Sequence, residues 1–170
     1  MRVFEEGEAP APEAVCGYEF RGFNTPKIMA LFGIRKFIKA FFLDQNTAYG
    51  CNTPATQNGL NQEWQAKPHD ADPKRFGFFE VDPTDSGAGG PSHALFLDYG
   101  RGHNKWYELS RVLRDYLVRV DPGSDELLLG KAYAQLGPIR IPVSYFLLER
   151  FRPIGSPIQL PGQAGAVGDS

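Results

Sequence analysis

The predicted fold rests on residues 106–152, WYELSRVLRDYLVRVDPGSDELLLGKAYAQLGPIRIPVSYFLLERFR. The first part of this stretch, residues 106–120, repeats apolar side chains at the i, i+3, i+4, i+7 and i+8 positions of a helix. These side chains are Leu109, Val112, Leu113, Tyr116 and Leu117. Pro122 cannot continue a helix and Gly123 tolerates positive φ, so both favour a helix end there. The pattern predicts one amphipathic helix with its apolar face toward the core.

Two strands are predicted after this helix, over residues 127–134 and 139–151, with Gly137 and Pro138 at the turn between them. In the second strand Pro142 lacks a backbone N–H, which favours a sheet edge or a β-bulge at that position. A hairpin alone buries little apolar surface, so earlier strands must close on it and the helix must cover it. These features predict a small α+β protein built on a strongly curved antiparallel sheet.

Apolar segments separated by Gly, Pro, Asn and Asp predict further strands upstream. The expected strands cover residues 16–23, 34–43, 76–81 and 94–99, with short strands around 49–52 and 62–65. Helix is an open alternative for the first half of 34–43. Residues 24–33, NTPKIMALFG, predict a short N-terminal helix, because Asn or Thr can cap it, Pro suits its first turn and Gly suits its end.

The length of 170 residues suits one domain with a core of its own. The acidic, Pro- and Ala-rich residues 1–13 predict a disordered tail, and residues 14–152 a single barrel-like domain. Residues 153–170 lack periodicity and predict a C-terminal extension that lies on the surface through Ile154, Ile158 and Leu160.

The charges are balanced, with eighteen Lys and Arg against twenty Asp and Glu and a net charge of −2. This balance gives no electrostatic reason to bind nucleic acid or an anionic membrane. No apolar signal region opens the chain, and no apolar run approaches the roughly 20 residues of a membrane-spanning helix. We therefore expect a soluble cytoplasmic protein, either a monomer or a homodimer. In that compartment free thiols at Cys16 and Cys51 are favoured over a disulfide.

The segment FRGFNTPKIMALFGIRKFIKAFF, residues 20–42, resembles the signature of the small bacterial GXWXG-type domain family. In that signature a Trp-Arg-Gly element precedes a Phe-x-Thr turn, a short helix, and a lysine closely followed by phenylalanine. Those places are taken here by Phe20-Arg21-Gly22, Phe23-Asn24-Thr25, and Lys39 with Phe41. LRDYLVRVDPGSDELLLGKAY and PVSYFLLER resemble the C-terminal half of the same proteins. The resemblance covers roughly residues 17–151 and implies a lipocalin-like β-barrel whose interior can hold a ligand, with no established activity.

No motif for phosphate, metal or covalent chemistry stands in the sequence. There is no Gly-rich loop followed by Lys and Ser or Thr, no HExxH, no CxxC and no GxSxG. His69, His93 and His103 are isolated, which favours surface loops over a metal triad. We therefore expect neither a metal nor a cofactor, and the candidate functional residues are polar groups within apolar strands.

Lys39 is the first of these groups, because on a strand it shares a face with Phe37 and Phe41. A buried ammonium without a partner is costly. Three arrangements relieve that cost: the side chain reaches solvent along its stem, it forms a structural ion pair, or it faces a ligand.

Lys131 and Tyr133 point to the same face of the strand at residues 127–134. The other face of this strand is small enough to lie under the predicted helix, and consists of Leu128, Gly130, Ala132 and Ala134. If the helix covers that face, Lys131 and Tyr133 look into the barrel; the alternative is a solvated face. Asp98, at the end of the strand at 94–99, would then supply a balancing carboxylate.

Three more side chains complete the predicted site. Asn52 and Asn58 lie in YGCNTPATQNG, residues 49–59, where turn formation is the ordinary role and lining a pocket mouth is the alternative. Tyr145 lies on the last strand and is expected to supply apolar area together with Phe37, Phe41 and Phe78. The predicted ligand-binding residues are Lys39, Phe41, Asn52, Asn58, Asp98, Lys131, Tyr133 and Tyr145.

Three functions are compatible with these residues. The first is binding of a small, largely apolar molecule inside a β-barrel, since a closed sheet of this size leaves an interior for side chains or one small ligand. The second is a cofactor-independent isomerase, cyclase or hydrolase that uses the same pocket for acid–base chemistry. The third is an interaction module with a filled core that works through residues 82–92 or the C-terminal extension.

Overall fold

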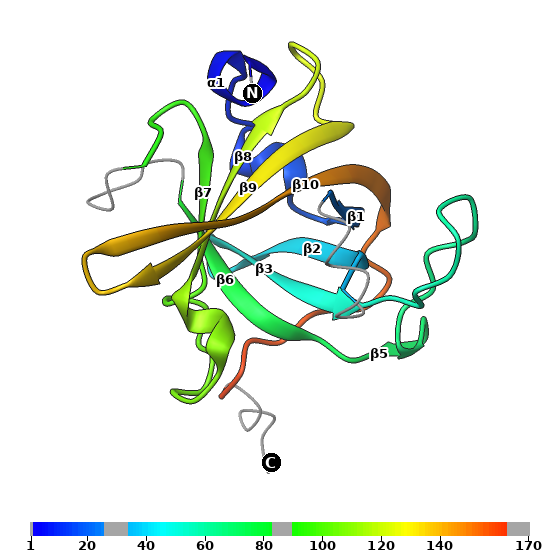
Figure 1. The fold of residues 1–170 in the computed structure, drawn as a ribbon. Coiled ribbons are helices and arrows are strands. Elements are labelled where there is room, and N and C mark those ends of the chain that lie inside the picture. Colours follow the sequence, from blue (N-terminus) through cyan, green and yellow to red (C-terminus); the bar gives the residue numbers. More distant parts are fainter. Residues whose placement is uncertain (1, 26–33, 83–89, 163–170) are drawn as a thin grey trace.

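The computed structural model describes residues 2–25, 34–82 and 90–162, and its main feature is a closed β-barrel (Figure 1). Within these ranges eight antiparallel strands follow one another around the barrel in the order β1-β10-β9-β8-β7-β6-β3-β2, and β2 closes the circle by pairing with β1. The barrel strands are β1 (Tyr18–Asn24), β2 (Lys36–Asp44), β3 (Thr47–Pro54), β6 (Phe76–Asp82), β7 (Leu95–Asp98), β8 (Leu113–Arg119), β9 (Leu127–Leu136) and β10 (Ile139–Pro153). The other elements are the helices α1 (Arg2–Glu6) and α2 (Pro12–Val15), the 3₁₀ helix η1 (Leu109–Val112), and the short strands β4 (Pro68–His69) and β5 (Asp72–Pro73).

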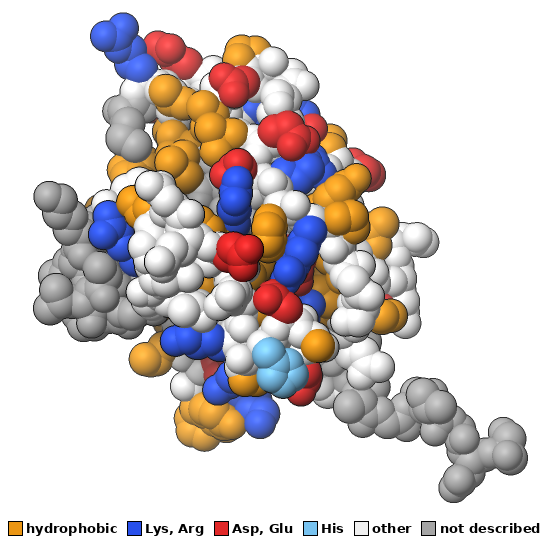
Figure 2. All heavy atoms as spheres, turned by 90° about the vertical axis from the view of Figure 1, so that its right-hand side faces the viewer, with side chains coloured by type: hydrophobic (Ala, Val, Ile, Leu, Met, Phe, Trp, Pro, Cys, Tyr) orange, Lys and Arg blue, Asp and Glu red, His pale blue; other side chains and the backbone are white. Residues whose placement is uncertain are grey.

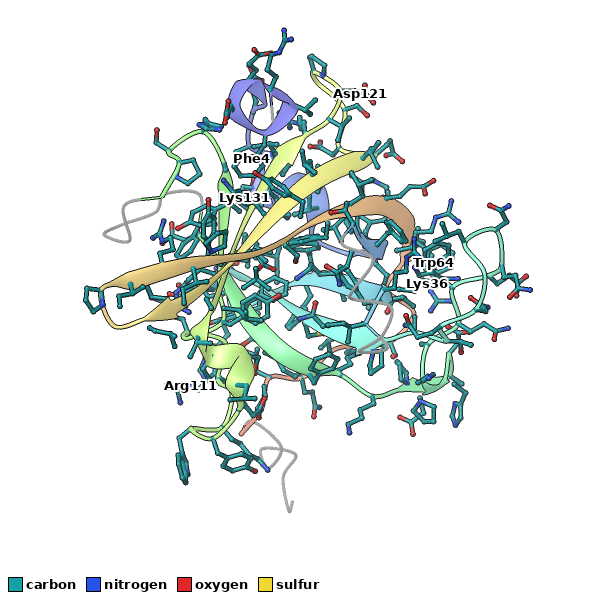
Figure 3. The ribbon with its side chains drawn as sticks, viewed as in Figure 1. Phe4, Lys36, Trp64, Arg111, Asp121 and Lys131 are labelled. Atoms are coloured by element: carbon teal, nitrogen blue, oxygen red, sulfur yellow. The ribbon has the colours of Figure 1, made fainter. Side chains whose placement is uncertain are left out.

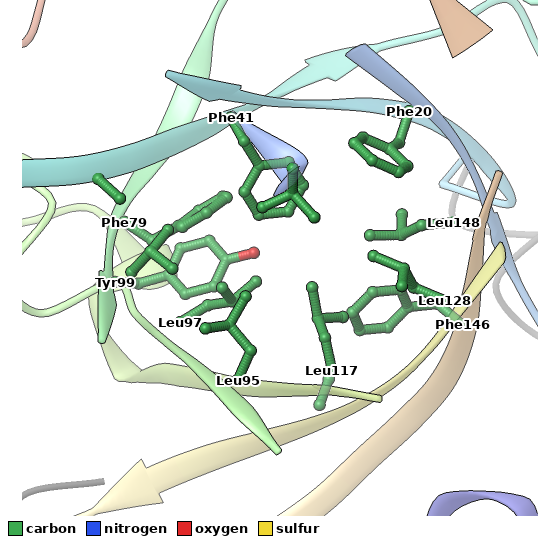
Figure 4. Close-up of a cluster of buried hydrophobic side chains, with 14 residues drawn as sticks. Phe20, Phe41, Phe79, Leu95, Leu97, Tyr99, Leu117, Leu128, Phe146 and Leu148 are labelled. Carbon is green, nitrogen blue, oxygen red and sulfur yellow. The ribbon is translucent and has the colours of Figure 1, made fainter. Parts of the chain in front are cut away.

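Inward-pointing side chains pack one end of the barrel solid (Figure 4). Because side chains alternate along a strand, every second residue of each strand points into the lumen. The labelled members of this inner cluster include Phe20, Phe41, Phe79, Leu95, Leu97, Leu117, Leu128 and Leu148. Val15 of α2 is fully buried against the same cluster, so α2 closes this end of the barrel.

The outer face of the barrel is also covered in two places. Phe4 of α1 packs on an outer cluster formed by Phe96, Tyr116, Val118 and Leu129. Residues 2–6 therefore form an ordered helix, in contrast to the predicted disordered tail, because Phe4 has an apolar surface to bury against. A third cluster forms on the outer side of β2 and β3, and it receives Ile154, Ile158 and Leu160 from the C-terminal segment, as predicted.

The predicted amphipathic helix over residues 106–120 is wrong. Only Leu109–Val112 forms a helical turn, η1, and Leu113–Arg119 forms strand β8 in the middle of the sheet. The i, i+3, i+4 spacing misleads here because β8 is buried on both faces: Leu117 points into the lumen, whereas Tyr116 and Val118 point to the outer cluster. A strand with two buried faces is nearly continuously apolar and lacks a clear period of two.

With one exception, the other strand predictions agree with the structure to within a few residues. The short strand expected around residues 62–65 is absent from the described chain, where that segment is irregular apart from a single bridge between Ala55 and Ala66. Most of the helix expected over residues 24–33 lies outside the described residues. The bulge predicted at Pro142 is confirmed, because the register of β9 and β10 shifts between Pro142 and Ser144.

Two glycines let phenylalanine rings lie flat against the barrel wall. A Cβ atom at Gly130 would come within 2.2 Å of the Phe146 ring, and one at Gly50 within 2.2 Å of the Phe79 ring. Each ring therefore fits against the wall only because the neighbouring strand has no side chain at that point. Phe146 belongs to the packed core and also lines a cavity, so it marks the level at which the packed core ends and the cavity begins.

Candidate functional site

A cavity of about 190 Å³ occupies the end of the barrel opposite α2. Its rim is apolar: the side chains of Ile34, Phe76 and Val143 line it and are 47%, 42% and 42% exposed. Below the rim the wall is formed by the rings of Phe37, Tyr99 and Phe146 and by Leu113 and Ala132. The polar lining residues are Asn24, Lys39, Asn52, Asp115 and Ser144.

A buried ion pair crosses the barrel at the floor of this cavity. Lys39 comes from β2 and Asp115 from β8, strands that lie opposite each other in the closed sheet. β1, β10 and β9 separate them on one side, and β3, β6 and β7 on the other. The Lys39 Nζ atom lies 3.3 Å from Asp115 Oδ2, and the two residues are 1% and 3% exposed. Of the arrangements considered for Lys39, the structure therefore contains the ion pair.

Tyr99 ties the two charges together. Its hydroxyl accepts a hydrogen bond from Lys39 Nζ at 2.7 Å and donates one to Asp115 Oδ2 at 2.9 Å. Asn52 Nδ2 donates to the same hydroxyl at 3.2 Å and to the backbone carbonyl of Gly77 at 3.2 Å. The Lys39 ammonium also lies 4.5 Å from the centre of the Phe79 ring, so it contacts an aromatic ring in addition to its hydrogen-bond partners.

Burial sets the protonation energetics of this cluster. It lowers the pKa of the Lys39 ammonium, while the Asp115 carboxylate acts in the opposite direction. It raises the pKa of the Asp115 carboxyl, against the effect of Lys39 and of the Tyr99 hydrogen bond. It also raises the pKa of Tyr99 well above its usual value, with the Asp115 charge as the next cause, so Tyr99 stays a neutral donor.

One oxygen of the cluster has no hydrogen-bond partner among the described residues. Asp115 Oδ1 is buried and accepts no hydrogen bond from the described residues, whereas Oδ2 accepts two. Buried carboxylate oxygens are almost always hydrogen-bonded, and an unpaired one is costly. Asp115 lines the cavity, so a molecule bound there can supply the missing donor.

The structure brings two of the predicted ligand-binding residues to this cavity. Lys39 and Asn52 line it and belong to the same hydrogen-bonded cluster. Phe41 faces the lumen as predicted but lies below the cavity, in the packed core with Phe20 and Phe79. Phe37, expected to supply apolar area, does line the cavity.

The expected inward orientation of Lys131 and Tyr133 is wrong. They lie on the outer face of β9 beneath α1, where Lys131 Nζ is 5.6 Å from the Phe4 ring and 5.4 Å from the Tyr145 ring (Figure 3). A hydrogen bond with Tyr133 raises the pKa of Lys131. The physical reason is that the stretch predicted as the covering helix forms strand β8, which pairs with β9 in the sheet. The small face of β9 points into the lumen, where the side chains projecting from other strands pack against Gly130 and Ala132.

Asp98 also lies outside the barrel and does not balance a lysine. Its Oδ1 atom lies 3.1 Å from Arg114 Nη1, and its Oδ2 atom lies 3.7 Å from Arg101 Nε. Side chains alternate along β7, so Leu97 and Tyr99 take the inward positions and Asp98 points out. Phe78 points outward in the same way, into the cluster with Phe42 and Cys51.

Asn58 anchors a loop and does not line the cavity. Its side-chain oxygen accepts a hydrogen bond from Lys36 Nζ, which also donates to the backbone carbonyls of Gln62 at 2.9 Å and Glu63 at 3.2 Å. The Lys36 ammonium lies 3.7 Å from the centre of the Trp64 ring, and Figure 3 shows the two side chains together at one side of the barrel. The loop of residues 57–64 is thus folded around one buried lysine.

Sequence reasoning missed Tyr99, Asp115 and Phe146 as lining residues. Asp115 lies in the stretch predicted as a helix and outside its apolar stripe, so that prediction gives no sign of its inward position on β8. Tyr99 follows directly after β7 on the inward side, and simple alternation from Leu95 and Leu97 indicates it. Phe146 alternates with Leu148 on β10 and was recognisable by the same rule.

Other features of the described chain add no second centre of this kind. Within residues 2–25, 34–82 and 90–162 no three His, Cys, Asp or Glu side chains gather in a way that could hold a metal ion. The face shown in Figure 2 mixes Lys and Arg with Asp and Glu, without a patch of one sign. None of the helices in the described ranges is long and apolar enough to cross a membrane. Cys16 and Cys51 are free thiols, as predicted.

Comparisons with protein-family models, with curated proteins and with solved structures find no match for this chain. The resemblance to the GXWXG-type domain family therefore stays a prediction, and the function is argued from the cavity alone.

Proposed function

We propose that this protein binds one small, largely apolar molecule in the cavity above Lys39, Tyr99 and Asp115. The observation that carries the proposal is an apolar cavity with a buried, incompletely hydrogen-bonded carboxylate at its floor. Binding pockets combine a mostly apolar lining with a few polar groups that fix orientation, and this arrangement has both parts.

The size of the cavity limits the ligand. An apolar cavity of about 150 Å³ is enough to bind benzene, and this cavity has about 190 Å³. It therefore suits a single ring, or an aliphatic group of similar size, with one small substituent. The rings of Phe37 and Phe146 would lie against such a molecule, and the exposed rim formed by Ile34, Phe76 and Val143 would be its entrance.

Filling the cavity tests the proposal. Ala132 lines the cavity from β9 and is buried, so Ala132→Leu would place a larger side chain in the binding space. Ala134→Leu, two residues further along the same strand and outside the lining, is the matched control. We expect native mass spectrometry to detect a bound small molecule on the wild-type protein and on the control, and none on Ala132→Leu. Equal occupancy of all three proteins would refute binding at this place.

A second candidate is a cofactor-independent isomerase, cyclase or hydrolase acting in the same cavity. The observation that favours it is the direct contact of Lys39 with Tyr99, combined with the lowered pKa of the lysine. Buried lysines with lowered pKa values serve as general bases. The discriminating experiment follows candidate ligands by NMR with wild-type protein and Lys39→Met. Conversion of the ligand that disappears in Lys39→Met favours catalysis, and a bound ligand that stays unchanged favours binding alone.

We further propose a cytoplasmic location, a monomer or homodimer, and no nucleic-acid partner. The balanced charges support the last point, because neither sign dominates the composition. Size-exclusion chromatography with light scattering would measure the oligomeric state directly, and a defined higher oligomer would contradict this part of the proposal.

A further inference from the structure

We infer that the ligand of this cavity is a neutral molecule with a hydroxyl group, an alcohol or a phenol, that donates a hydrogen bond to Asp115 Oδ1. This inference rests on the proposed function and narrows it to a chemical class. It starts from the one buried oxygen of the Lys39–Tyr99–Asp115 cluster that no described residue contacts by a hydrogen bond.

The protonation state of Asp115 follows from its other oxygen. Oδ2 accepts one hydrogen bond from the Tyr99 hydroxyl and one from the Lys39 ammonium. Two donors on one oxygen, one of them cationic, match an ionised carboxylate. The second oxygen of an ionised carboxylate is an acceptor, so Oδ1 requires a donor from the ligand. A ketone, ether or hydrocarbon leaves it unpaired.

The charge of the cluster selects a neutral ligand. Lys39 and Asp115 are the only charged side chains among the described residues that line the cavity, and their charges cancel. A carboxylate or ammonium ligand would bring one uncompensated charge into an apolar enclosure, which is costly. A hydroxyl group meets the donor requirement without that cost.

The same hydroxyl can also accept from Lys39. Among the described residues, the Lys39 ammonium donates two hydrogen bonds, to Tyr99 and to Asp115, and an ammonium has three N–H groups. A hydroxyl is both donor and acceptor, so a single group of the ligand can satisfy Asp115 Oδ1 and the third N–H together. The rest of the ligand would lie between the rings of Phe37 and Phe146.

Three probes separate this inference from the proposed function. Toluene tests whether the cavity binds a ring, anisole adds an oxygen without an O–H, and phenol adds the donor. By isothermal titration calorimetry we expect the wild-type protein to bind all three, and phenol about tenfold more tightly than anisole, because hydrogen bonds to charged groups are among the stronger ones. This comparison needs no variant, so it decides the question even if a substitution in the cluster prevents folding.

Asp115→Asn then replaces the acceptor, since the amide nitrogen can take the place of Oδ1. We expect this variant to lose the preference for phenol over anisole. Asp98→Asn is the matched control, because Asp98 is the carboxylate on the outer face and pairs with Arg114. It should keep the wild-type preference.

The possible failures are distinguishable. Binding of toluene without a preference for phenol over anisole would overturn the inference and leave the proposed function standing, because the cavity would still bind an apolar ring. Absence of binding for all three probes would overturn the proposed function itself. A preference for phenol that persists in Asp115→Asn would also overturn the inference, since the donor would then be meeting another group.

Discussion

Lys39 Nζ and Asp115 Oδ2 lie 3.3 Å apart inside the barrel, although the two residues are 76 positions apart in the chain. The pair joins strands on opposite walls, so it forms only when the barrel has closed. A buried ion pair of this kind stabilises little by itself, because the desolvation of both charges offsets their attraction. Its position at the floor of the cavity suits the proposed role in ligand binding.

The first prediction concerns the two charges taken singly and together. Lys39→Met and Asp115→Leu should each lower the free energy of unfolding by about 3–5 kcal/mol, because each leaves one uncompensated buried charge. The double variant should lose less than either single variant, since no charge then remains. Urea unfolding of the four proteins measures this cycle. Losses that simply add in the double variant would contradict the coupling of the two residues.

The second prediction is a pH dependence of stability due to Lys39. Its pKa is lowered in the folded protein, from an ordinary value of 10.5, because the ammonium is buried. Between the folded and the unfolded pKa, the unfolded chain therefore binds more protons at this site, so stability rises with pH in that window. Below the folded pKa the lysine is protonated in both the folded and the unfolded protein, and the stability gained at higher pH is lost. We expect wild-type protein to gain stability relative to Lys39→Met as the pH rises toward 10.5.

Urea unfolding of both proteins at a series of pH values tests this sign. Lys39 also lowers the pKa of the Asp115 carboxyl, so Asp115 titrates differently in Lys39→Met. The same comparison between Asp115→Leu and the double variant removes that contribution and isolates the lysine. Parallel curves, or a difference that shrinks as the pH rises, would show that the Lys39 pKa is not lowered on folding.

The third prediction concerns the loop folded around Lys36. Lys36→Met removes hydrogen bonds to Asn58 and to the carbonyls of Gln62 and Glu63, and leaves those oxygens to find water. We expect a loss of about 2–4 kcal/mol, since bonds to a charged group contribute more than neutral ones. Lys67→Met, an exposed lysine nearby, should change stability by less than about 0.5 kcal/mol. Similar losses in both variants would contradict the anchoring role.

The fourth prediction concerns thiol reactivity. Burial raises the pKa of both Cys16 and Cys51 to about 11, with the Glu13 charge as a further cause for Cys16. At pH 8 only about 0.1% of such a thiol is thiolate, against about a quarter for an unperturbed one. Alkylation by iodoacetamide, followed by peptide mass spectrometry, should therefore be slow at pH 8 and accelerate only above about pH 10. Labelling at the rate of a free thiol in urea would contradict the raised pKa values.

Most strands were predictable from local patterns, and so was the pairing of the last two strands as a hairpin. Alternating apolar residues in 34–43, 76–81 and 139–151 indicated strands, and the missing N–H of Pro142 indicated the bulge in β10. That Lys39 shares a face with Phe37 and Phe41 followed from the same alternation, although solvent, an ion pair and a ligand all remained open as its partner. These are properties of neighbouring residues and need no knowledge of the rest of the chain.

The candidate site was predictable only in part. Lys39 and Asn52 were identified, but the helical spacing around Asp115 gave no sign that it pairs with Lys39. Asp98 was expected to balance Lys131, whereas it pairs with Arg114 outside the barrel. Lys131 was assigned to the wrong face because that assignment depended on the same helix. One error about β8 therefore changed the predicted composition of the pocket.

By itself, the sequence determined a strongly curved antiparallel sheet or barrel, a lysine on an apolar strand face, and the absence of motifs for metal or phosphate chemistry. Only the tertiary structure decided which face of β8 and β9 points inward and which carboxylate meets that lysine. The physical reason is that an inward face is defined by closure of the whole barrel. A strand buried on both sides, such as β8, has no local pattern that tells its two faces apart.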